Sequence, residues 1–244
     1  MISIVTALYN YADYIKYSIN SVIQQTYTDW EMIIVDDCST DNPYKILNNI
    51  IDTRIKVFRL EKNSGPSFAR NYAIRKSSGD YITFLDADDM LTQDSLSVRL
   101  NKLIQSDAIW CHGRALNLIN GKLEKKDQFH SLWKEFQNKK LNTEYSKCIH
   151  SNSVLVKRDF YKKFGLFDID LRYGEEQDLW KRAIAFNFYP VYEKKPVCIY
   201  RNHPNQTRFK PGAKLLKKEC LEISQKRLKI RLLEGINSSN TVLL

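Results

Sequence analysis

The stretch YITFLDADDM, residues 81–90, joins a largely apolar, strand-like run to a cluster of three aspartates. Asp86, Asp88 and Asp89 fall within four positions, and carboxylates this close repel one another unless a cation or hydrogen-bond donors offset their charge. A single aspartate is enough to cap a helix that begins near Leu91. Three aspartates therefore favour a divalent cation bound at the end of the strand.

The first hundred residues alternate between short apolar runs and segments of mixed periodicity. The runs ISIVTAL, EMIIVDD, IKVFRL and YITFLDADD predict strands, and residues 12–25, 40–51 and 65–77 predict helices. Alternation of this kind is typical of an α/β fold with a mostly parallel sheet flanked by helices. We see no internal repeat and no low-complexity segment.

Polar residues follow three of these predicted strands. Asn10 follows the first, Asp36 and Asp37 the second, and the aspartates of DADD the fourth. Ligands of open α/β sheets bind outside the carboxyl ends of the strands. The sequence therefore predicts a binding site at this edge of the sheet.

The remaining chain has a looser pattern. Residues 107–119 predict a strand or a strand pair, and the polar stretch 120–145 predicts a loop with a short helix. Further predicted elements are a strand and a helix ending at Gly165 (150–165), a helix with an acidic first turn (175–187), a last strand (196–203) and a basic helix (212–234).

Composition bounds the class of protein. The chain has 244 residues, 43% of them hydrophobic and 27% charged, as in a folded domain with a C-terminal appendage. No run of 18 apolar residues predicts an ordinary transmembrane helix, and MISIVTALYNY is typical of a first strand rather than a signal peptide. Five scattered cysteines without a CxxC pair favour a reducing compartment and argue against a zinc site. We therefore expect a cytoplasmic protein.

The formal net charge of +10 is concentrated late in the chain. Residues 201–244 carry ten Lys and Arg against three Asp and Glu, whereas residues 1–100 carry ten against thirteen. A basic tail suits an anionic partner such as a membrane surface, nucleic acid or phosphate groups. With 14 Tyr and 11 Phe, a nucleic-acid-binding protein is one alternative, although these aromatics lie mostly within apolar runs.

A second alternative comes from the acidic stretch itself. FLDADDM loosely matches the DxDx[T/V] signature of aspartyl-phosphate phosphatases, in which the first aspartate is the nucleophile. Met90 occupies the Thr or Val position, and the motif follows the fourth strand instead of the first. Both features count against a phosphatase.

Four ordered motifs resemble the family 2 glycosyltransferases, which are nucleotide-sugar-dependent enzymes of the GT-A fold. They are SIVTALYNYADYIKYSINSVIQQTYTDWEMIIVDDCSTD, NSGPSFARNYAIRKSSGDYITFLDADD, SNSVLVKRDFYKKFGLFDIDLRYGEEQDLWKRA and YRNHPNQTR. The resemblance covers about residues 1–208 and implies one GT-A domain there, a Rossmann-like mixed sheet flanked by helices. Residues 209–244 then form a separate basic helical extension.

The resemblance implies a divalent cation, Mn²⁺ or Mg²⁺, that offsets the charge of the leaving diphosphate. DAD matches the DxD motif of the family, which implies metal binding by Asp88 and a ribose or metal contact by Asp86, with Ala87 between them at the nucleotide-sugar. Which carboxylate touches the metal stays open. Asp89 is expected to cap a helix. His203, near Arg201 and Arg208, matches a further metal or diphosphate contact.

The same resemblance assigns residues to the nucleotide. Asp37, or Asp36 beside it, would accept a hydrogen bond from the imide N–H of uracil. The stretch from Thr6 to Leu8 would border the base, Arg70 would lie near the nucleotide, and Asn63 and Gly65 would shape the loop before Arg70.

GEEQDLW resembles the acidic motif in which the family places its catalytic base, with Glu176 where aspartate is usual. Glu175 and Asp178 remain rival bases, and all three carboxylates would also stabilise a helix N-terminus.

The resemblance thus implies an inverting glycosyltransferase that moves a sugar from a nucleotide-sugar, expected to be a UDP-sugar, to a hydroxyl of a glycan or glycolipid in cell-surface polysaccharide assembly. Residues 212–234 could place such an enzyme on the inner face of the cytoplasmic membrane, because basic and leucine residues share that helix. Packing of the helix against its own domain or a second subunit is the alternative, which leaves a homo-oligomer open.

Overall fold

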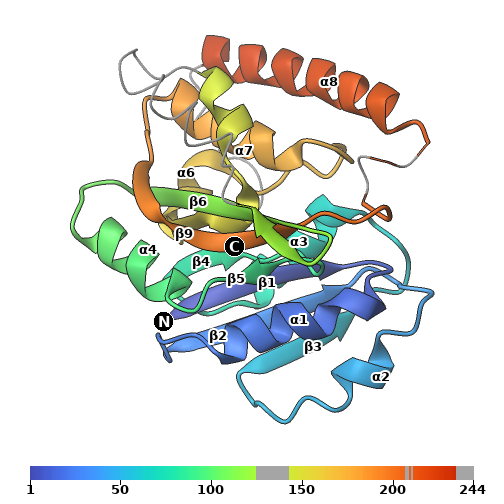
Figure 1. Ribbon diagram of the computed structural model, residues 1–244. Coiled ribbons are helices and arrows are strands. Elements are labelled where there is room, and N and C mark those ends of the chain that lie inside the picture. Colours follow the sequence, from blue (N-terminus) through green and yellow to red (C-terminus); the bar gives the residue numbers. More distant parts are fainter. Residues whose placement is uncertain (125–142, 207–208, 210, 235–244) are drawn as a thin grey trace.

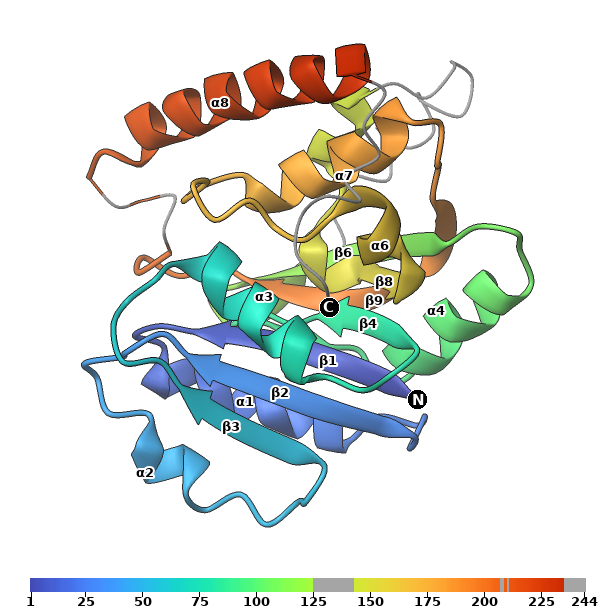
Figure 2. The same cartoon turned by 180° about the vertical axis from the view of Figure 1, so that it is seen from behind.

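The structure is a computed structural model that describes residues 1–124, 143–206, 209 and 211–234 (Figure 1). Its centre is a nine-stranded sheet in which the strands follow the order β3-β2-β1-β4-β8-β6-β9-β5, with β7 paired to β6. Helices cover both faces of this sheet (Figures 1 and 2). The predicted α/β class is confirmed.

The first four strands form the parallel half of the sheet. They are β1 (Ile2–Leu8), β2 (Trp30–Asp36), β3 (Ile55–Arg59) and β4 (Tyr81–Phe84), and all three pairings between them are parallel. Both faces are apolar because alternate side chains of β1 and β2 enter different cores. Ile4 packs with α1 (Ala12–Ile23), whereas Val5 packs with α3 (Pro66–Lys76) on the other face.

The second half of the sheet is mixed. Its strands are β5 (Met90–Leu91), β6 (Trp110–Ile119), β7 (Lys122–Glu124), β8 (Val154–Lys157) and β9 (Val191–Arg201). β8 runs antiparallel to both β4 and β6, whereas β6 and β9 are parallel. The parallel arrangement expected from the first hundred residues is confirmed for β1 to β4, and the second half makes the whole sheet mixed, as the resemblance implied.

The other helices are α2 (Tyr44–Leu47), α4 (Ser95–Ile104), α6 (Asp159–Phe164), α7 (Glu175–Ala185) and α8 (Ala213–Glu234), with 3₁₀ turns η1 (Thr143–Cys148) and η2 (Ser151–Ser153). The helices predicted over 12–25, 65–77, 175–187 and 212–234 are confirmed, as is the helix end at Gly165.

Two expected helices were wrong. The helix over 40–51 is a single turn, flanked by Asn42 at φ 54° and by a further pair of asparagines, which are weak helix formers. No helix begins near Leu91, because Leu91 pairs with Cys198 in the sheet and α4 begins only at Ser95. The loop expected over 120–145 falls mostly on residues 125–142, which lie outside the described residues.

Helix α8 packs on α7 at the far side of the molecule (Figures 1 and 2). Ser224 donates a 2.6 Å hydrogen bond to Asp178, and Arg227 forms ion pairs with Asp168 and Asp170. No helix among the described residues is long and apolar enough to cross a membrane. The division at residues 208 and 209 stays a prediction, because positions 207, 208 and 210 lie outside the described residues.

Candidate active site

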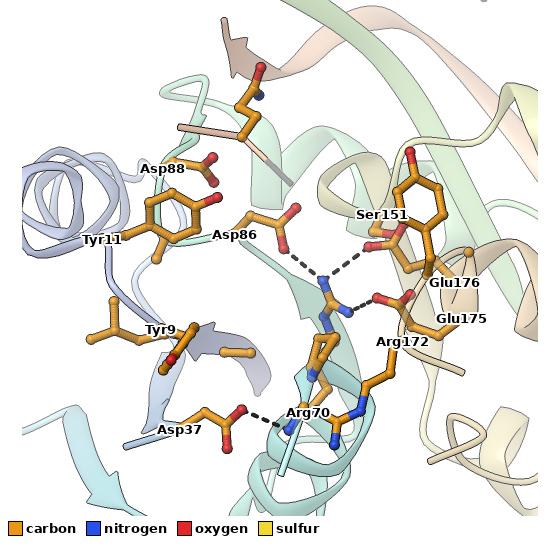
Figure 3. Close-up of a pocket in the computed structure, with 18 of the residues that line it drawn as sticks. Tyr9, Tyr11, Asp37, Arg70, Asp86, Asp88, Ser151, Arg172, Glu175 and Glu176 are labelled. Carbon is orange, nitrogen blue, oxygen red and sulfur yellow. Dashed lines mark hydrogen bonds and ion pairs between the residues drawn. The ribbon is translucent and has the colours of Figure 1, made fainter. Parts of the chain in front are cut away.

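A cleft of about 500 Å³ opens at the carboxyl edge of the parallel strands (Figure 3). It is lined by the end of β1, the loop before α3, the turn after β4, the segment around η1 and η2, and the start of α7. The main polar and aromatic side chains of the lining are those of Tyr9, Tyr11, Asp37, Asn63, Arg70, Asp86, Asp88, Lys147, His150, Ser151, Arg172, Tyr173, Glu175, Glu176, Gln177, Tyr200 and Gln206. Parallel strands bring their carboxyl ends to one edge, which is where the sequence predicted a site.

On one side of the cleft, Asp37 organises the loop before α3. Its two carboxylate oxygens accept backbone N–H bonds from Ser64 at 2.6 Å and Gly65 at 2.8 Å. Burial raises the pKa of Asp37 in spite of these donors and of the nearby charge of Arg172. Gly65 has φ 92°, and a Cβ there would lie 2.5 Å from the Arg172 guanidinium. The loop thus requires glycine for its backbone and for the approach of Arg172.

Arg70 lies at the centre of the cleft and binds three carboxylates from two sides (Figure 3). Its guanidinium donates to Glu175 at 2.6 Å, to Asp86 at 2.9 Å and to Glu176 at 3.0 Å. Burial disfavours the charged guanidinium, but the three carboxylates outweigh that effect and raise the pKa of Arg70. One side chain of α3 thereby connects the turn after β4 to the start of α7.

The electrostatics of Glu176 differ from those of an ordinary surface glutamate. Burial raises the pKa of Glu176 to about 8, against the attraction of Arg70 and with further repulsion from Glu175 and Asp86. Ser151 lies beside it (Figure 3). A carboxyl group whose pKa is near neutrality can take up and release a proton at physiological pH.

The turn after β4 places Asp86 and Asp88 at the cleft. Asp88 is bonded to Nε2 of His203 at 2.9 Å, and both side chains are largely buried. Burial, together with the charge of Asp86, raises the pKa of Asp88. The predicted grouping of Asp86, Asp88 and His203 is therefore present, although His203 reaches the cleft only through Asp88.

Asp89 is not a helix cap, and that expectation was wrong. Its carboxylate is buried beneath the turn, where it accepts hydrogen bonds from the side chain of Asn152 and from the backbone N–H of Arg201. Burial and the two neighbouring aspartates raise the pKa of Asp89 well above its ordinary value. The chain continues into β5, so no helix N-terminus is present for Asp89 to cap.

The acidic turn has the donors that a hard divalent cation prefers. Among the described residues, no three His, Cys, Asp or Glu side chains are grouped as a complete metal site. Asp86 and Asp88 nevertheless both line the cleft with carboxylates. The raised pKa of Asp88 indicates that its negative charge is only partly offset by the protein. Mg²⁺ is commonly held by one or two carboxylates together with substrate phosphates, so the residues present fit such an ion.

Besides His203, three predicted site residues do not line the cleft. Thr6 is fully buried within β1. Asp36 is also buried, with one carboxylate oxygen accepting the N–H of Ser39 and the other 3.8 Å from Arg59. Successive side chains of a strand point to opposite faces, so Asp37 and not Asp36 meets the cleft.

Asp178 is the third. Its carboxylate lies 3.0 Å from Nε of Arg182 and accepts the hydroxyl of Ser224, away from the cleft. Glu175 and Glu176 are therefore the members of the acidic cluster that the fold brings to the cleft, and the third candidate base is withdrawn. Leu8, Asn63, Gly65 and Ala87 line the cleft as predicted, and Arg208 lies outside the described residues.

Several lining residues were not identified from the sequence. Tyr9 and Tyr11 lie within three residues of the end of β1, and Arg172 lies three residues before Glu175, so their proximity to predicted site residues was an available signal. Tyr200 opens the motif YRNHPNQTR and lies three residues before His203, so the same signal was available for it. Lys147 carries no such signal and reaches the cleft only because η1 folds back to it.

Comparison with known proteins identifies related chains. The family model described as "Glycosyl transferase family 2" matches residues 3–164. TuaG of Bacillus subtilis, a putative teichuronic acid biosynthesis glycosyltransferase, is 45% identical over 107 residues, which are 43% of this chain and 42% of TuaG. WfgD of Escherichia coli, named a UDP-Glc:alpha-D-GlcNAc-diphosphoundecaprenol beta-1,3-glucosyltransferase, is 36% identical over 114 residues, which are 46% of this chain and 45% of WfgD. In both, the match spans less than half of the relative.

Solved structures share the fold. S. aureus TarS 1–349 in complex with UDP-GlcNAc superposes with a TM-score of 0.69 at 19% identity, over 100% of this chain and 76% of that one. The mannosyltransferase PcManGT of Pyrobaculum calidifontis, in complex with GDP-Man and Mn²⁺, gives 0.70 at 15% identity, over 94% of this chain and 64% of that one. These likenesses establish the GT-A type of fold expected from the sequence.

Proposed function

The chain belongs to glycosyl transferase family 2, and from this premise we propose that it transfers a sugar from a nucleotide-sugar to a hydroxyl group with inversion at the anomeric carbon. The family membership gives no support to the phosphatase and nucleic-acid alternatives. The observation that carries the proposal is the network around Arg70, which joins Asp86 on the donor side to Glu175 and Glu176 on the opposite side of one cleft.

The nucleotide is assigned to the side of the cleft formed by β1 and the loop before α3. Leu8, Asn63 and Gly65 line this side, and Asp37 retains free lone pairs with which to accept an N–H from the base. Tyr9, 37% exposed, offers a ring face on which a base can stack. We favour a UDP-sugar, a choice supported by the UDP-GlcNAc complex of TarS.

Asp88 and Asp86 would hold a divalent cation, with His203 fixing the orientation of the Asp88 carboxylate. Such an ion neutralises charge on the diphosphate leaving group. Mn²⁺ or Mg²⁺ suits these oxygen donors, and the Mn²⁺ complex of PcManGT supports the choice. Arg70 adds a fixed positive charge beside Asp86 on the same side.

Glu176 is the proposed general base. An acceptor hydroxyl is a poor nucleophile, and a carboxylate within hydrogen-bond reach can take its proton as the new bond forms. The raised pKa of Glu176 makes it a stronger base than an ordinary glutamate, and Arg70 fixes one of its oxygens. An inverting displacement requires one base and no enzyme nucleophile, which fits this single acidic cluster.

The acceptor is proposed to be a glycan or glycolipid hydroxyl in cell-surface polysaccharide assembly. The names of TuaG and WfgD support that setting. The acceptor side of the cleft carries Lys147, Tyr173, Gln177 and Tyr200, a mixture of aromatic and polar groups suited to a sugar ring.

Helix α8 is proposed to contact an anionic membrane surface, and of the leucines expected to take part, Leu216, Leu221, Leu228 and Leu232, only Leu232 is exposed. Leu216, Leu221 and Leu228 are half-buried toward the domain. The exposed apolar residues of α8 are Leu215, Ile223, Ile230, Leu232 and Leu233, and the exposed lysines are Lys214, Lys217, Lys218, Lys226 and Lys229. Each basic residue near an anionic surface contributes about 1 kcal/mol.

Vesicle sedimentation tests this surface. Replacing Lys218, Lys226 and Lys229 together by Ala should weaken binding to anionic vesicles at least tenfold and leave transfer to a soluble acceptor unchanged. Equal binding of the native protein to neutral and anionic vesicles would remove the membrane proposal. A homo-oligomer stays a prediction.

The function is tested by a panel of nucleotide-sugars measured with and without Mn²⁺. Binding raises the unfolding temperature in proportion to ln(1 + [L]/Kd), so the correct donor should stand out among UDP-, GDP- and dTDP-sugars. Release of free nucleotide that depends on an added glycan or glycolipid acceptor then establishes transfer. Stabilisation by no nucleotide-sugar in the panel would contradict the proposed function.

A further inference from the structure

The acidic turn after β4 is held from beneath by one buried side chain, that of Asn152. This residue lies in η2, far along the chain from the turn, and none of it is exposed. Its Oδ1 accepts the backbone N–H of Asp86 at 2.9 Å, and its Nδ2 donates to the buried carboxylate of Asp89. One amide therefore bonds to both ends of the four-residue segment Asp86–Asp89.

The position of Asn152 is itself fixed by the core. Arg99, fully buried in α4, donates to the backbone carbonyl of Asn152 at 3.2 Å, to that of Val154 at 2.8 Å and to the hydroxyl of Thr83 at 2.6 Å. Buried polar groups without partners are unfavourable, so this arginine and these oxygens restrain one another. The amide of Asn152 is thus presented by a rigid part of the fold.

A second support reaches the turn from β9. Asp89 accepts the backbone N–H of Arg201 at 2.8 Å, and the Arg201 side chain donates to the carbonyl of Asp88 at 3.0 Å. His203, two residues on, is bonded to the carboxylate of Asp88. Asp89 is therefore the point at which the supports from η2 and β9 meet.

We propose that Asn152 is a positioning residue: by bonding the Asp86 backbone and the Asp89 carboxylate together, it sets the spacing at which Asp86 and Asp88 meet a divalent cation and the nucleotide diphosphate. The inference rests on the proposed function for the identity of that ligand. Asn152 takes no part in the proposed reaction and does not line the cleft. Its effect passes through the shape of the turn, because sites of this kind depend on the groups that orient the ligands.

An exchange of the two side chains tests the bonding pattern. Asn152→Asp removes the donor to Asp89 and places two carboxylates together, and Asp89→Asn places two amides together. The double variant D89N/N152D restores one donor, both acceptors and the original net charge. In it, the new amide at position 89 can donate to the new carboxylate at position 152 and still accept from Arg201, while that carboxylate still accepts the N–H of Asp86.

The readout is the affinity for Mn²⁺ in the presence of UDP, from the electron paramagnetic resonance of free Mn²⁺. Each single variant should weaken this affinity at least tenfold, and the double variant should return it to within about threefold of the native value. Ser153→Ala is the matched control: Ser153 is equally buried, and its hydroxyl donates to the His150 carbonyl. This control should lower the unfolding temperature without changing Mn²⁺ affinity.

Native Mn²⁺ affinity in a folded Asn152→Asp or Asp89→Asn variant would overturn the proposal, as would a folded double variant that fails to recover affinity. If Asn152→Asp does not fold, the comparison of Asp89→Asn with the double variant decides by the same criterion. A native protein that binds no Mn²⁺ with UDP would instead contradict the proposed function, so the two failures are distinguishable.

Discussion

The two edges of the parallel sheet use carboxylates in opposite ways. At the amino edge, Glu31 is 6% exposed and accepts bonds from the hydroxyl of Ser3 at 2.8 Å, from the hydroxyl of Ser78 at 2.9 Å and from Lys56 at 3.1 Å. Burial opposes ionisation of Glu31, but the backbone N–H of Ser78, at 2.5 Å, and these side-chain donors outweigh it and lower the pKa of Glu31 to about 2. At the carboxyl edge, the pKa values of Asp37, Asp88 and Glu176 are raised.

This difference distinguishes carboxylates that stabilise the fold from carboxylates that are available for function. A carboxylate whose pKa is lowered by folding stabilises the folded chain, because the folded state favours its charge. A carboxylate whose pKa is raised by folding is less stable in its charged form in the folded state than in the unfolded chain. Such groups are frequent at functional sites. The unfavourable charges at the carboxyl edge would therefore be balanced when a cation with its diphosphate, and a proton, bind there.

The largest expected effect is on the turn after β4, where we propose that a divalent cation binds. Asp88→Asn should lower the transfer rate about 10³-fold, because oxygen ligands hold Mg²⁺ and Mn²⁺ through their charge. Chelation with EDTA should abolish activity, and Mn²⁺ or Mg²⁺ should restore it. Steady-state rates on the purified variant measure the loss, with Asp36→Asn as the control that leaves the cleft intact. Full activity in EDTA would show that the carboxyl edge needs no cation, and the proposed functional difference between the two edges would then be wrong.

The pH dependence of kcat is the next effect. A base must be deprotonated to act, and the pKa of Glu176 is about 8. The rate should therefore rise with pH and fall about tenfold per unit at pH values below the pKa of the donor complex. Because the bound cation neutralises the diphosphate, the donor complex adds little net charge, and the midpoint should stay near 8. A rate that is flat from pH 5 to pH 9 would contradict the assignment.

The amino edge predicts the opposite behaviour. Glu31→Gln should lower the free energy of unfolding by about 2 kcal/mol and leave kcat and KM unchanged, because it removes a charge that several donors bind. Since the folded pKa of Glu31 is depressed, its contribution is complete above pH ~4.5 and is lost as the pH falls toward 2. Urea unfolding at pH 7 and pH 3 should show a smaller difference from the native protein at pH 3.

The smallest effect concerns stability at the carboxyl edge. Asp88→Asn should raise the free energy of unfolding of the ligand-free protein by roughly 1 kcal/mol at pH 7, since it removes a charge that burial and the neighbouring Asp86 disfavour. The bond to His203 can persist with an amide oxygen. A destabilisation as large as that of Glu31→Gln would show that Asp88 has a structural role, and the comparison of the two edges would then be wrong.

The sequence predicted the parallel half and its carboxyl edge well because both depend on local pattern. Asp37 and Asp86 closely follow apolar strands, and the parallel direction of these strands places both residues at one edge of the sheet, whatever the fold of its second half. The placement of Asp178 was not predictable, because its partner Ser224 lies on a helix 46 residues away. Asp89 was misassigned for the same reason, since Asn152 and Arg201 reach it only in the folded chain.

Glu176 is the residue on which the proposed chemistry depends most, because that chemistry requires a base that Arg70 holds at the cleft. The most direct measurement is the single-turnover transfer rate of Glu176→Gln beside that of Glu175→Gln, with nucleotide-sugar affinity determined on the same samples. We expect Glu176→Gln to lose 10²-fold or more in rate at nearly native affinity, and Glu175→Gln to lose less. Near-native turnover by Glu176→Gln would contradict the proposed mechanism.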